Sequence, residues 1–235
     1  MPRKEAASDC IHCPIRSISI FAGFTVEDLR RLNIPVFTMR YETGEVFYRE
    51  QAAVSAAWTI KSGVVKLMRE LPSGRSQTLR LLTTGDIFGF EGLMDNHYHH
   101  TAVALTEVQA CRLRLSDLTR VCHENPHVHE AILQRWAQAL RQAESLIVEL
   151  GTRKAPERLA DFLEQWCSQP GQDGWTPFPL TRQELAELLG LTVETVSRIL
   201  AEWKRSGCLE ERSGRIRLLG GCLVPSGTGH GADTN

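Results

Sequence analysis

The feature that most constrains this chain is a segment near its C-terminus, residues 180–207, in which two helical patterns are separated by one tight turn. Thr181 and Glu184 have the spacing of a capping box, which predicts that a helix begins there. Gly190 follows the first helical pattern, and a glycine in this place is typical of a helix end. A second helix is expected from Val193, crossing the first, because so short a turn reverses the chain abruptly.

The second helix of this segment has two chemically distinct faces. The apolar faces of both helices predict a shared core made of Leu185, Leu188, Leu189, Val196, Ile199 and Leu200. The polar face carries Glu194, Ser197 and Arg198 near the N-terminal end, which a helix-turn-helix places against base edges in the major groove of DNA. Arginine binds guanine through two hydrogen bonds and glutamate accepts one from cytosine. We therefore expect these three residues to read bases.

Three further residues of the segment are suited to the DNA backbone. Thr181, Arg182 and Thr192 lie at the starts of the two helices, where hydroxyl and guanidinium groups can donate to phosphate oxygens. A short hairpin with basic residues follows, from about 207 to 218, and has the form of a wing. The alternative is an ordinary pair of solvated helices. Spacing, turn and polar face agree with one another, so double-stranded DNA is the expected partner.

A different pattern fills residues 36–115. Short apolar runs alternate there with turn residues, and Gly44, Gly63, Gly74 and Gly85 fall between the runs. Many short strands at regular spacing are typical of an antiparallel roll or barrel. This region is therefore expected to form a β-roll.

A long helical pattern follows, from about 126 to 150. Apolar residues recur along it at alternating spacings of three and four, the pattern of a coiled-coil seam. The seam positions are Leu133, Trp136, Leu140, Ala143, Ile147 and Leu150. Such a narrow stripe favours pairing with a second copy of the chain over packing on the chain's own domain, which is the alternative. A homodimer is expected, and no charged residue interrupts the seam.

The sequence predicts a protein that does not span a membrane, and its patterns divide the chain into five parts. The chain has 235 residues, a formal net charge of −1 and no apolar run of about 18 residues, so no transmembrane helix and no membrane partner is expected. The N-terminus lacks the apolar core of a signal peptide, and a cytoplasmic protein is expected. The expected parts are a cysteine-containing arm (1–20), a β-roll sensor (21–122), a dimerisation helix (123–152), a winged helix-turn-helix (153–219) and a disordered tail (220–235).

The segment TRQELAELLGLTVETVSRILAEWKRSG resembles the DNA-binding signature of the CRP/FNR family of bacterial transcription regulators. The β region, the long helix and the helix-turn-helix also follow one another as in that family. The resemblance implies an α+β chain with a cupin-like (cyclic-nucleotide-binding-like) β-roll, a homodimer, contact with RNA polymerase and no enzymatic activity. Ser197 before Arg198 is similar to the FNR branch, which implies a palindromic site with TTGAT-like half-sites.

The resemblance to the FNR branch also implies a cofactor. That branch binds a [4Fe–4S] cluster through cysteine thiolates, and Cys10, Cys13 and Cys111 match three of its four ligand positions. Such a cluster would sense oxygen, redox state or nitric oxide. The remaining position falls on Ser19, so a fourth ligand would come from Ser19, His12, an acidic residue or a small molecule. The open alternatives are a reversible thiol–disulfide switch, a zinc site and cysteines without a ligand.

The residues of the expected β-roll also indicate which ligands it could bind. Cyclic-nucleotide binders of the family hold the phosphate with an Arg-Ser pair, because a guanidinium matches a phosphate. This chain has His100-Thr101 at that position and no arginine between Arg80 and Arg112, which disfavours cyclic AMP. Another small-molecule effector stays open. A cupin-type metal enzyme is the remote alternative, although the histidines around His97 share one loop instead of lining facing strands.

Overall fold

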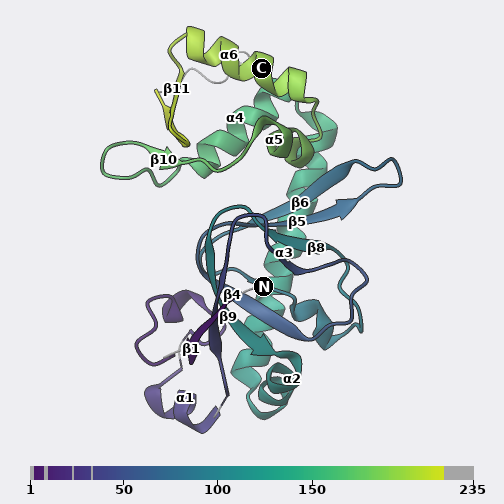
Figure 1. Cartoon of the computed structure of the whole chain (residues 1–235), viewed down its shortest axis with the longest axis vertical. Coiled ribbons are helices and arrows are strands. Elements are labelled where there is room, and N and C mark those ends of the chain that lie inside the picture. The colour runs from purple at the N-terminus through teal and green to yellow at the C-terminus, as the bar shows by residue number, and fades with distance from the viewer. Residues whose placement is uncertain (1–2, 8–9, 23, 33, 220–235) are drawn as a thin grey trace, which may run out of the picture. The chain divides into compact units, whose positions relative to one another are not determined.

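The structure is a computed structural model that describes residues 3–7, 10–22, 24–32 and 34–219. The expected tail, 220–235, lies outside the described residues. The chain divides into two compact units, one up to Ala143 and one from Glu144, which are taken separately below (Figure 1). Within the described residues, no helix is long and apolar enough to span a bilayer.

The first unit contains two antiparallel sheets. Its strands are β1 (Arg3–Ala7), β2 (Phe37–Tyr41), β3 (Val46–Tyr48), β4 (Ala56–Ser62), β5 (Val65–Glu70), β6 (Ser76–Leu82), β7 (Ile87–Phe88), β8 (Thr101–Ala104) and β9 (Val108–Arg114). The order β1-β2-β9-β4-β7 forms one sheet and β3-β8-β5-β6 forms the other. These short strands confirm the β-roll predicted from the alternating apolar runs. β1 is an addition, since no strand was predicted in the arm.

An aromatic cluster forms the core of the β-roll. Trp58 stacks on Phe88 at 5.6 Å between ring centroids, and Tyr48 stacks on Tyr98 at 3.7 Å. Trp58 Nε1 also donates a hydrogen bond of 2.9 Å to the hydroxyl of Tyr41. Large rings that are buried and hydrogen-bonded hold the two sheets together and leave little room for rearrangement.

The first unit also contains helices. They are η1 (Arg16–Ile18), α1 (Val26–Leu32), η2 (Phe90–Leu93), α2 (Leu115–Glu124) and α3 (Pro126–Thr152), the last of which continues into the second unit. Helix α2 was not predicted as a separate element, and it takes up His123 and Glu124, so the long helix begins at Pro126 instead of 123. Buried Leu118, Val128 and other apolar residues of α2 and α3 pack into one cluster with the arm.

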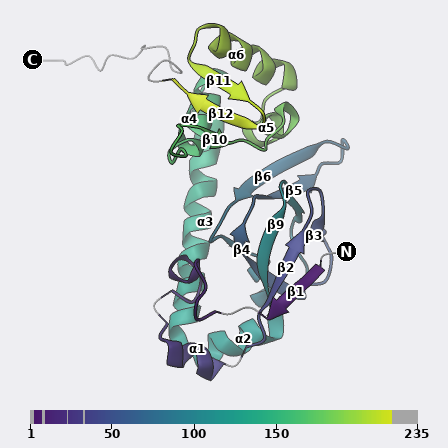
Figure 2. The same ribbon diagram turned by 60° about the vertical axis from the view of Figure 1, so that its left-hand side comes forward.

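The second unit is a small winged domain. Its remaining elements are α4 (Ala155–Trp166), β10 (Thr176–Pro177), α5 (Arg182–Leu189), α6 (Val193–Arg205), β11 (Leu209–Arg212) and β12 (Arg215–Leu218). The three strands form one antiparallel sheet in the order β10-β12-β11, and α6 packs against β11 (Figure 2). Apolar faces of the three helices supply the core, which contains Leu159, Leu163, Leu185 and Leu200.

Candidate nucleic-acid interface and sensor site

Two capped helices and a left-handed glycine build the helix-turn-helix. The hydroxyl of Thr181 accepts a hydrogen bond from the backbone N–H of Glu184, whose carboxylate accepts from the N–H of Thr181 at 2.8 Å. Gly190 ends α5 with a φ of 61°, a conformation that side chains other than glycine adopt at a cost. The hydroxyl of Thr192 then accepts from the N–H of Thr195 and starts α6. The predicted motif is confirmed at each of these points.

Helix α6 presents the predicted reading residues to solvent. Val196, Ile199, Leu200 and Trp203 are buried on one face, whereas Glu194, Ser197 and Arg198 are exposed on the other. Hydrogen bonds from its own backbone N–H and from Thr192 lower the pKa of Glu194, so the carboxylate is ionised at neutral pH and can only accept. Among the described residues, no acidic side chain pairs with Arg198.

The three residues expected at phosphates have different surroundings. Thr181 and Thr192 are exposed, but their hydroxyl oxygens already cap the two helices. Arg182, the first residue of α5, forms an ion pair with Glu211 of β11, and Lys204 near the end of α6 pairs with the same carboxylate. The residues Arg182, Lys204 and Glu211 are called the ion triad below. The sequence suggested that Arg182 is available to a phosphate, but its guanidinium is already paired within the chain.

The wing is also less basic than its sequence indicates. Arg215 of β12 donates to both carboxylate oxygens of Asp173 at 2.8 and 3.1 Å. Arg217 pairs with Glu210 through its Nε at 3.0 Å and lies over the ring of Trp175 at 5.0 Å. Carboxylates from the preceding loop and from β11 thus neutralise both arginines of β12.

Helix α3 carries the expected dimer seam. Leu133, Leu140, Ile147 and Leu150 are exposed, with Leu140 and Ile147 at 61% and 70%, and Ala143 is exposed as well. Trp136 differs, because its ring packs at 5.6 Å on Phe90 of η2 and is partly buried against the apolar cluster. A stripe of large apolar side chains exposed to water is costly, and such a stripe is typical of an interaction surface.

A buried polar group lies in the β-roll where the family's Arg-Ser pair was sought. Nε2 of His100 lies 2.7 Å from the hydroxyl of Tyr48 and 3.5 Å from Oε1 of Glu91. Burial lowers the pKa of His100 to about 4, and it raises the pKa of Glu91 and, more strongly, that of Tyr48. The hydroxyl of Thr101 accepts from the backbone N–H of Glu50. These side chains therefore bind one another inside the β-roll.

Comparisons with known proteins identify the family. Residues 38–125 match the protein family described as "Cyclic nucleotide-binding domain". Residues 157–220 match the family described as "Crp-like helix-turn-helix domain". The nitrogen fixation regulation protein FixK of Bradyrhizobium diazoefficiens is 29% identical over 214 residues, which cover 89% of this chain and 90% of FixK. This chain belongs to the CRP/FNR family of transcription regulators.

Two further relatives agree with this assignment. The fumarate and nitrate reduction regulatory protein of Escherichia coli strain K12 is 25% identical over 236 residues, covering 97% of this chain and 94% of that protein. The solved structure of FixK2 from Bradyrhizobium japonicum is 27% identical, with a TM-score of 0.72 over 78% of this chain and 92% of that one. The predicted fold class is confirmed, and the relatives regulate transcription instead of catalysing reactions.

In this CRP/FNR regulator the cysteines do not form a preassembled cluster site. Cys10 and Cys111 are partly buried against the same apolar cluster, and Cys13 is half-buried on the arm. The hydroxyl of Ser19 is buried and donates to the backbone oxygen of Arg16. In the part of the chain that the structure describes, no three His, Cys, Asp or Glu side chains gather as metal ligands. The donors present therefore do not fit a [4Fe–4S] cluster in this conformation.

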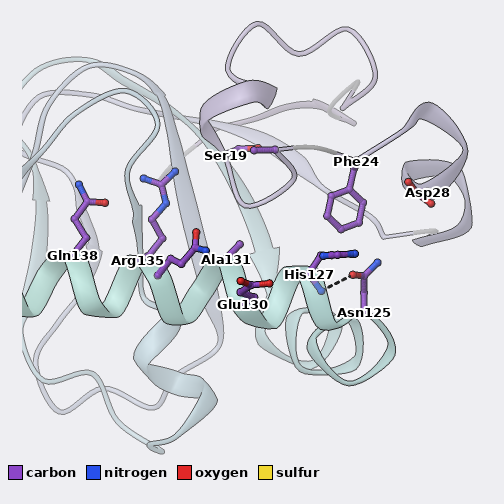
Figure 3. Close-up of a pocket in the computed structure, with 11 residues that line it drawn as sticks. Ser19, Phe24, Asp28, Asn125, His127, Glu130, Ala131, Arg135 and Gln138 are labelled. Atoms are coloured by element: carbon purple, nitrogen blue, oxygen red, sulfur yellow. Dashed lines mark hydrogen bonds between the residues drawn. The ribbon is translucent and has the colours of Figure 1, made fainter.

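A polar cavity of about 670 Å³ lies between the arm and the first half of α3 (Figure 3). Arg135 points into it but donates to the backbone oxygen of Ile18. Asp28 accepts from the N–H and the hydroxyl of Thr25. Arg135 and Asp28 at its wall thus have partners within the chain.

The sequence did not reveal the ion triad or the buried Tyr48, Glu91 and His100. Each joins residues that are far apart in the chain, 29 positions for Arg182 and Glu211 and 52 for Tyr48 and His100. Periodicity reports neighbours within one element, so it gives no signal for such pairs. The sequence held one hint of these ion pairs. Three acidic residues lie near the cluster of basic residues in the wing, and they are Asp173, Glu210 and Glu211.

Proposed function

We propose that this CRP/FNR regulator is a cytoplasmic homodimer whose two α6 helices bind a palindromic DNA site with TTGAT-like half-sites. The observation that carries the proposal is the exposed trio Glu194, Ser197 and Arg198 on a helix whose opposite face is buried. An arginine, an acceptor and a small hydroxyl side by side can discriminate base pairs in the major groove. Arg182 reaches a phosphate beside them, with Thr181 and Thr192 at the two helix starts.

The dimer supports the palindrome. Two copies related by a twofold axis present identical reading helices to identical half-sites about one helical turn apart. The exposed stripe on α3 supplies a self-complementary surface for such a pair, because it combines exposed Leu140 and Ile147 with small Ala143. Residues 123–152 therefore act as the dimerisation segment between a β-roll sensor, 21–122, and the DNA-binding residues 153–219. Contact with RNA polymerase follows from the family and completes the output.

A fluorescence-anisotropy titration tests this function. A labelled palindromic duplex and a scrambled duplex of equal length and composition are compared at one salt concentration, since affinities depend on salt. We expect the palindrome to bind about 1,000-fold tighter or more, as specific regulators do. Equal binding of both duplexes would exclude sequence-specific recognition by this chain.

For the input we propose a response to oxygen or redox state through Cys10 and Cys13, with the thiol switch favoured over the Fe–S cluster. The support is that Ser19 replaces a ligand and that, among the described residues, no three His, Cys, Asp or Glu side chains gather as metal ligands. In this reaction two thiols lose two electrons and two protons to a peroxide, which is reduced to water, and a disulfide forms. The C-x-x-C spacing places both sulfurs on the same arm.

Two measurements separate these chemistries. Protein purified without oxygen should be colourless and free of iron, and peroxide should then change DNA affinity in the parent but not in the Cys10→Ser variant. A broad absorption band near about 400 nm with bound iron would overturn the thiol switch in favour of the cluster. An unchanged peroxide response in Cys10→Ser would exclude Cys10 as the sensor.

A further inference from the structure

The winged domain has an unusual charge balance for a DNA-binding surface. Over residues 155–219, acidic residues outnumber basic ones. A DNA-binding domain ordinarily concentrates positive charge on the face that meets the phosphates, because release of counterions supplies most of the sequence-independent affinity. Here several cations of that face are held by carboxylates of the same domain, and the ion triad is the case that involves a predicted phosphate contact.

The ion triad joins the helix-turn-helix to the wing. Arg182 begins α5, Lys204 lies in the last turn of α6, and Glu211 projects from β11, which packs against α6 (Figure 2). Both cations meet one oxygen, Oε2 of Glu211. Glu211 is the least exposed of the three side chains at 25% and Lys204 the most at 40%. Glu211 thus holds two cations, one from each helix of the helix-turn-helix, through charge-assisted bonds to one partly buried carboxylate.

The charge state of Glu211 is fixed at neutral pH. Partial burial acts to raise its pKa, but the hydrogen bonds and charges of Arg182 and Lys204 outweigh burial and leave the pKa below its ordinary value. The carboxylate is therefore an anion whenever DNA is present at neutral pH. An open groove of about 560 Å³ borders Lys204, Glu211 and Arg212, so a phosphate has access to Lys204 and to the carboxylate that holds it.

We propose that Glu211 acts as an internal competitor of the DNA phosphate, which lowers sequence-independent DNA binding. A carboxylate offers a guanidinium the same kind of paired oxygen acceptors as a phosphate does. Arg182 must therefore leave Glu211 before it can donate to DNA, and the cost of breaking this bond is subtracted from the phosphate contact on every sequence. The inference rests on the proposed phosphate contact of Arg182.

The proposal separates affinity from specificity. Breaking the ion triad costs the same on a cognate and on a random duplex, because phosphates are alike in both. Base reading by Arg198 is untouched. Loss of the Glu211 charge should thus raise affinity for both duplexes by a similar factor and leave their ratio unchanged, whereas changes on the reading face alter the ratio.

The salt dependence of binding measures the number of cations engaged. Each phosphate contact adds about 0.9 to the negative slope of log K against log salt. In Glu211→Gln, which keeps size and shape, Arg182 and Lys204 are both released for DNA, so the slope should steepen by about 1–2. Affinity near 0.1 M salt should rise about three- to tenfold on both duplexes. Glu211→Thr, which suits a strand, should give the same result.

Two controls distinguish this role from a structural one. Glu202→Gln removes the same charge from exposed α6 but releases no cation, so its slope should match the parent. Arg182→Gln should lower the slope by about 0.9 in the Glu211→Gln background and by less in the parent, where Glu211 holds the arginine. Circular dichroism checks that each variant is folded.

Three results would overturn the proposal. Parent-like slope and affinity in both Glu211 variants would show that Glu211 does not compete with DNA. An equal effect of Arg182→Gln in both backgrounds would retain the phosphate contact and reject its control by Glu211. No effect of Arg182→Gln in either background would reject the phosphate contact itself, and with it the inference.

Discussion

The winged domain and the β-roll treat their polar side chains in opposite ways. On α6, Glu194, Ser197 and Arg198 are exposed and directed to solvent. In the β-roll, Tyr48 is buried, Glu91 and His100 are half-buried, and the three side chains contact one another. A surface that binds another molecule keeps its hydrogen-bond donors and acceptors accessible. Polar side chains that bind one another inside a core instead specify one packing arrangement. The reading residues of α6 are therefore accessible, although Arg182 beside them is paired with Glu211, and the polar side chains of the β-roll bind one another.

The largest expected effect comes from the exposed stripe on α3, which we propose joins two copies of the chain. Leu140→Glu places two like charges opposite each other in the proposed seam, which should yield a monomer. Loss of the second reading helix should then weaken binding of the palindrome by about 100-fold or more. Light scattering after size-exclusion chromatography and anisotropy measure the two effects.

A matched variant guards this interpretation. Ser145→Glu adds the same charge to an exposed position on another side of α3 and should remain a dimer with parent-like affinity. A Leu140→Glu protein that is still dimeric, or a parent that is monomeric when aerobic, would show that α3 is not the dimer surface.

Arg198→Ala tests the exposed face directly. Removal of a two-bond contact to guanine should cost roughly 1–3 kcal/mol per half-site and fall on the palindrome alone. The ratio of affinities for palindromic and scrambled duplexes should therefore drop while binding of the scrambled duplex changes little. A variant that discriminates as well as the parent would remove Arg198 from the reading face.

The next largest effect concerns His100 of the β-roll, which should make the free energy of unfolding depend on pH. His100 has a pKa of about 4 when folded, against an ordinary 6.5, so between these values the unfolded chain binds a proton that the folded chain does not. Stability should fall as the pH drops through this window, by on the order of 2 kcal/mol from His100. The raised pKa of Glu91 acts in the opposite direction and offsets part of the loss.

Urea unfolding at several pH values from 7 to 4.5 measures this effect. His100→Gln should have a flatter profile than the parent, because it lacks the group that gains a proton on unfolding. Equal slopes in the two proteins would mean that His100 is accessible to protons in the folded state. His97→Gln, which removes an exposed imidazole from the same loop, is the matched control.

The smallest effect belongs to the helix caps. Thr192→Ala removes the hydroxyl that accepts from Thr195 and should lower the free energy of unfolding by about 1 kcal/mol. Thr192→Ser keeps an acceptor and should retain most of that stability. A full-size loss in the serine variant would point to the methyl group instead of the cap.

The same contrast explains what the sequence could predict. The helix-turn-helix was predictable because its determinants are local, with a capping residue at Thr181 and a glycine at position 190. The strands followed from alternation and turn glycines. Helix α2 was missed because residues 115–122 were assigned to the β-roll, and the long helical pattern was taken to begin only at about 126.

Pairings between distant residues were beyond the sequence. Trp136 fits the seam spacing, yet its ring packs on Phe90, because position along a helix does not say which neighbour a large ring meets. The histidines around His97 were expected to share one loop, and His97 and His99 are exposed there, but His100 turns inward to Tyr48. The Arg182–Glu211 pair depends on how the wing folds against α6, which only the tertiary structure fixes.

The central claim is that this chain reads a palindrome with two α6 helices. Selection from a pool of randomised duplexes with the purified, reduced protein tests it most directly, because it presupposes no site. The account predicts enrichment of two inverted TTGAT-like half-sites about one helical turn apart. Recovery of a single unrepeated half-site, or of no common sequence, would contradict it.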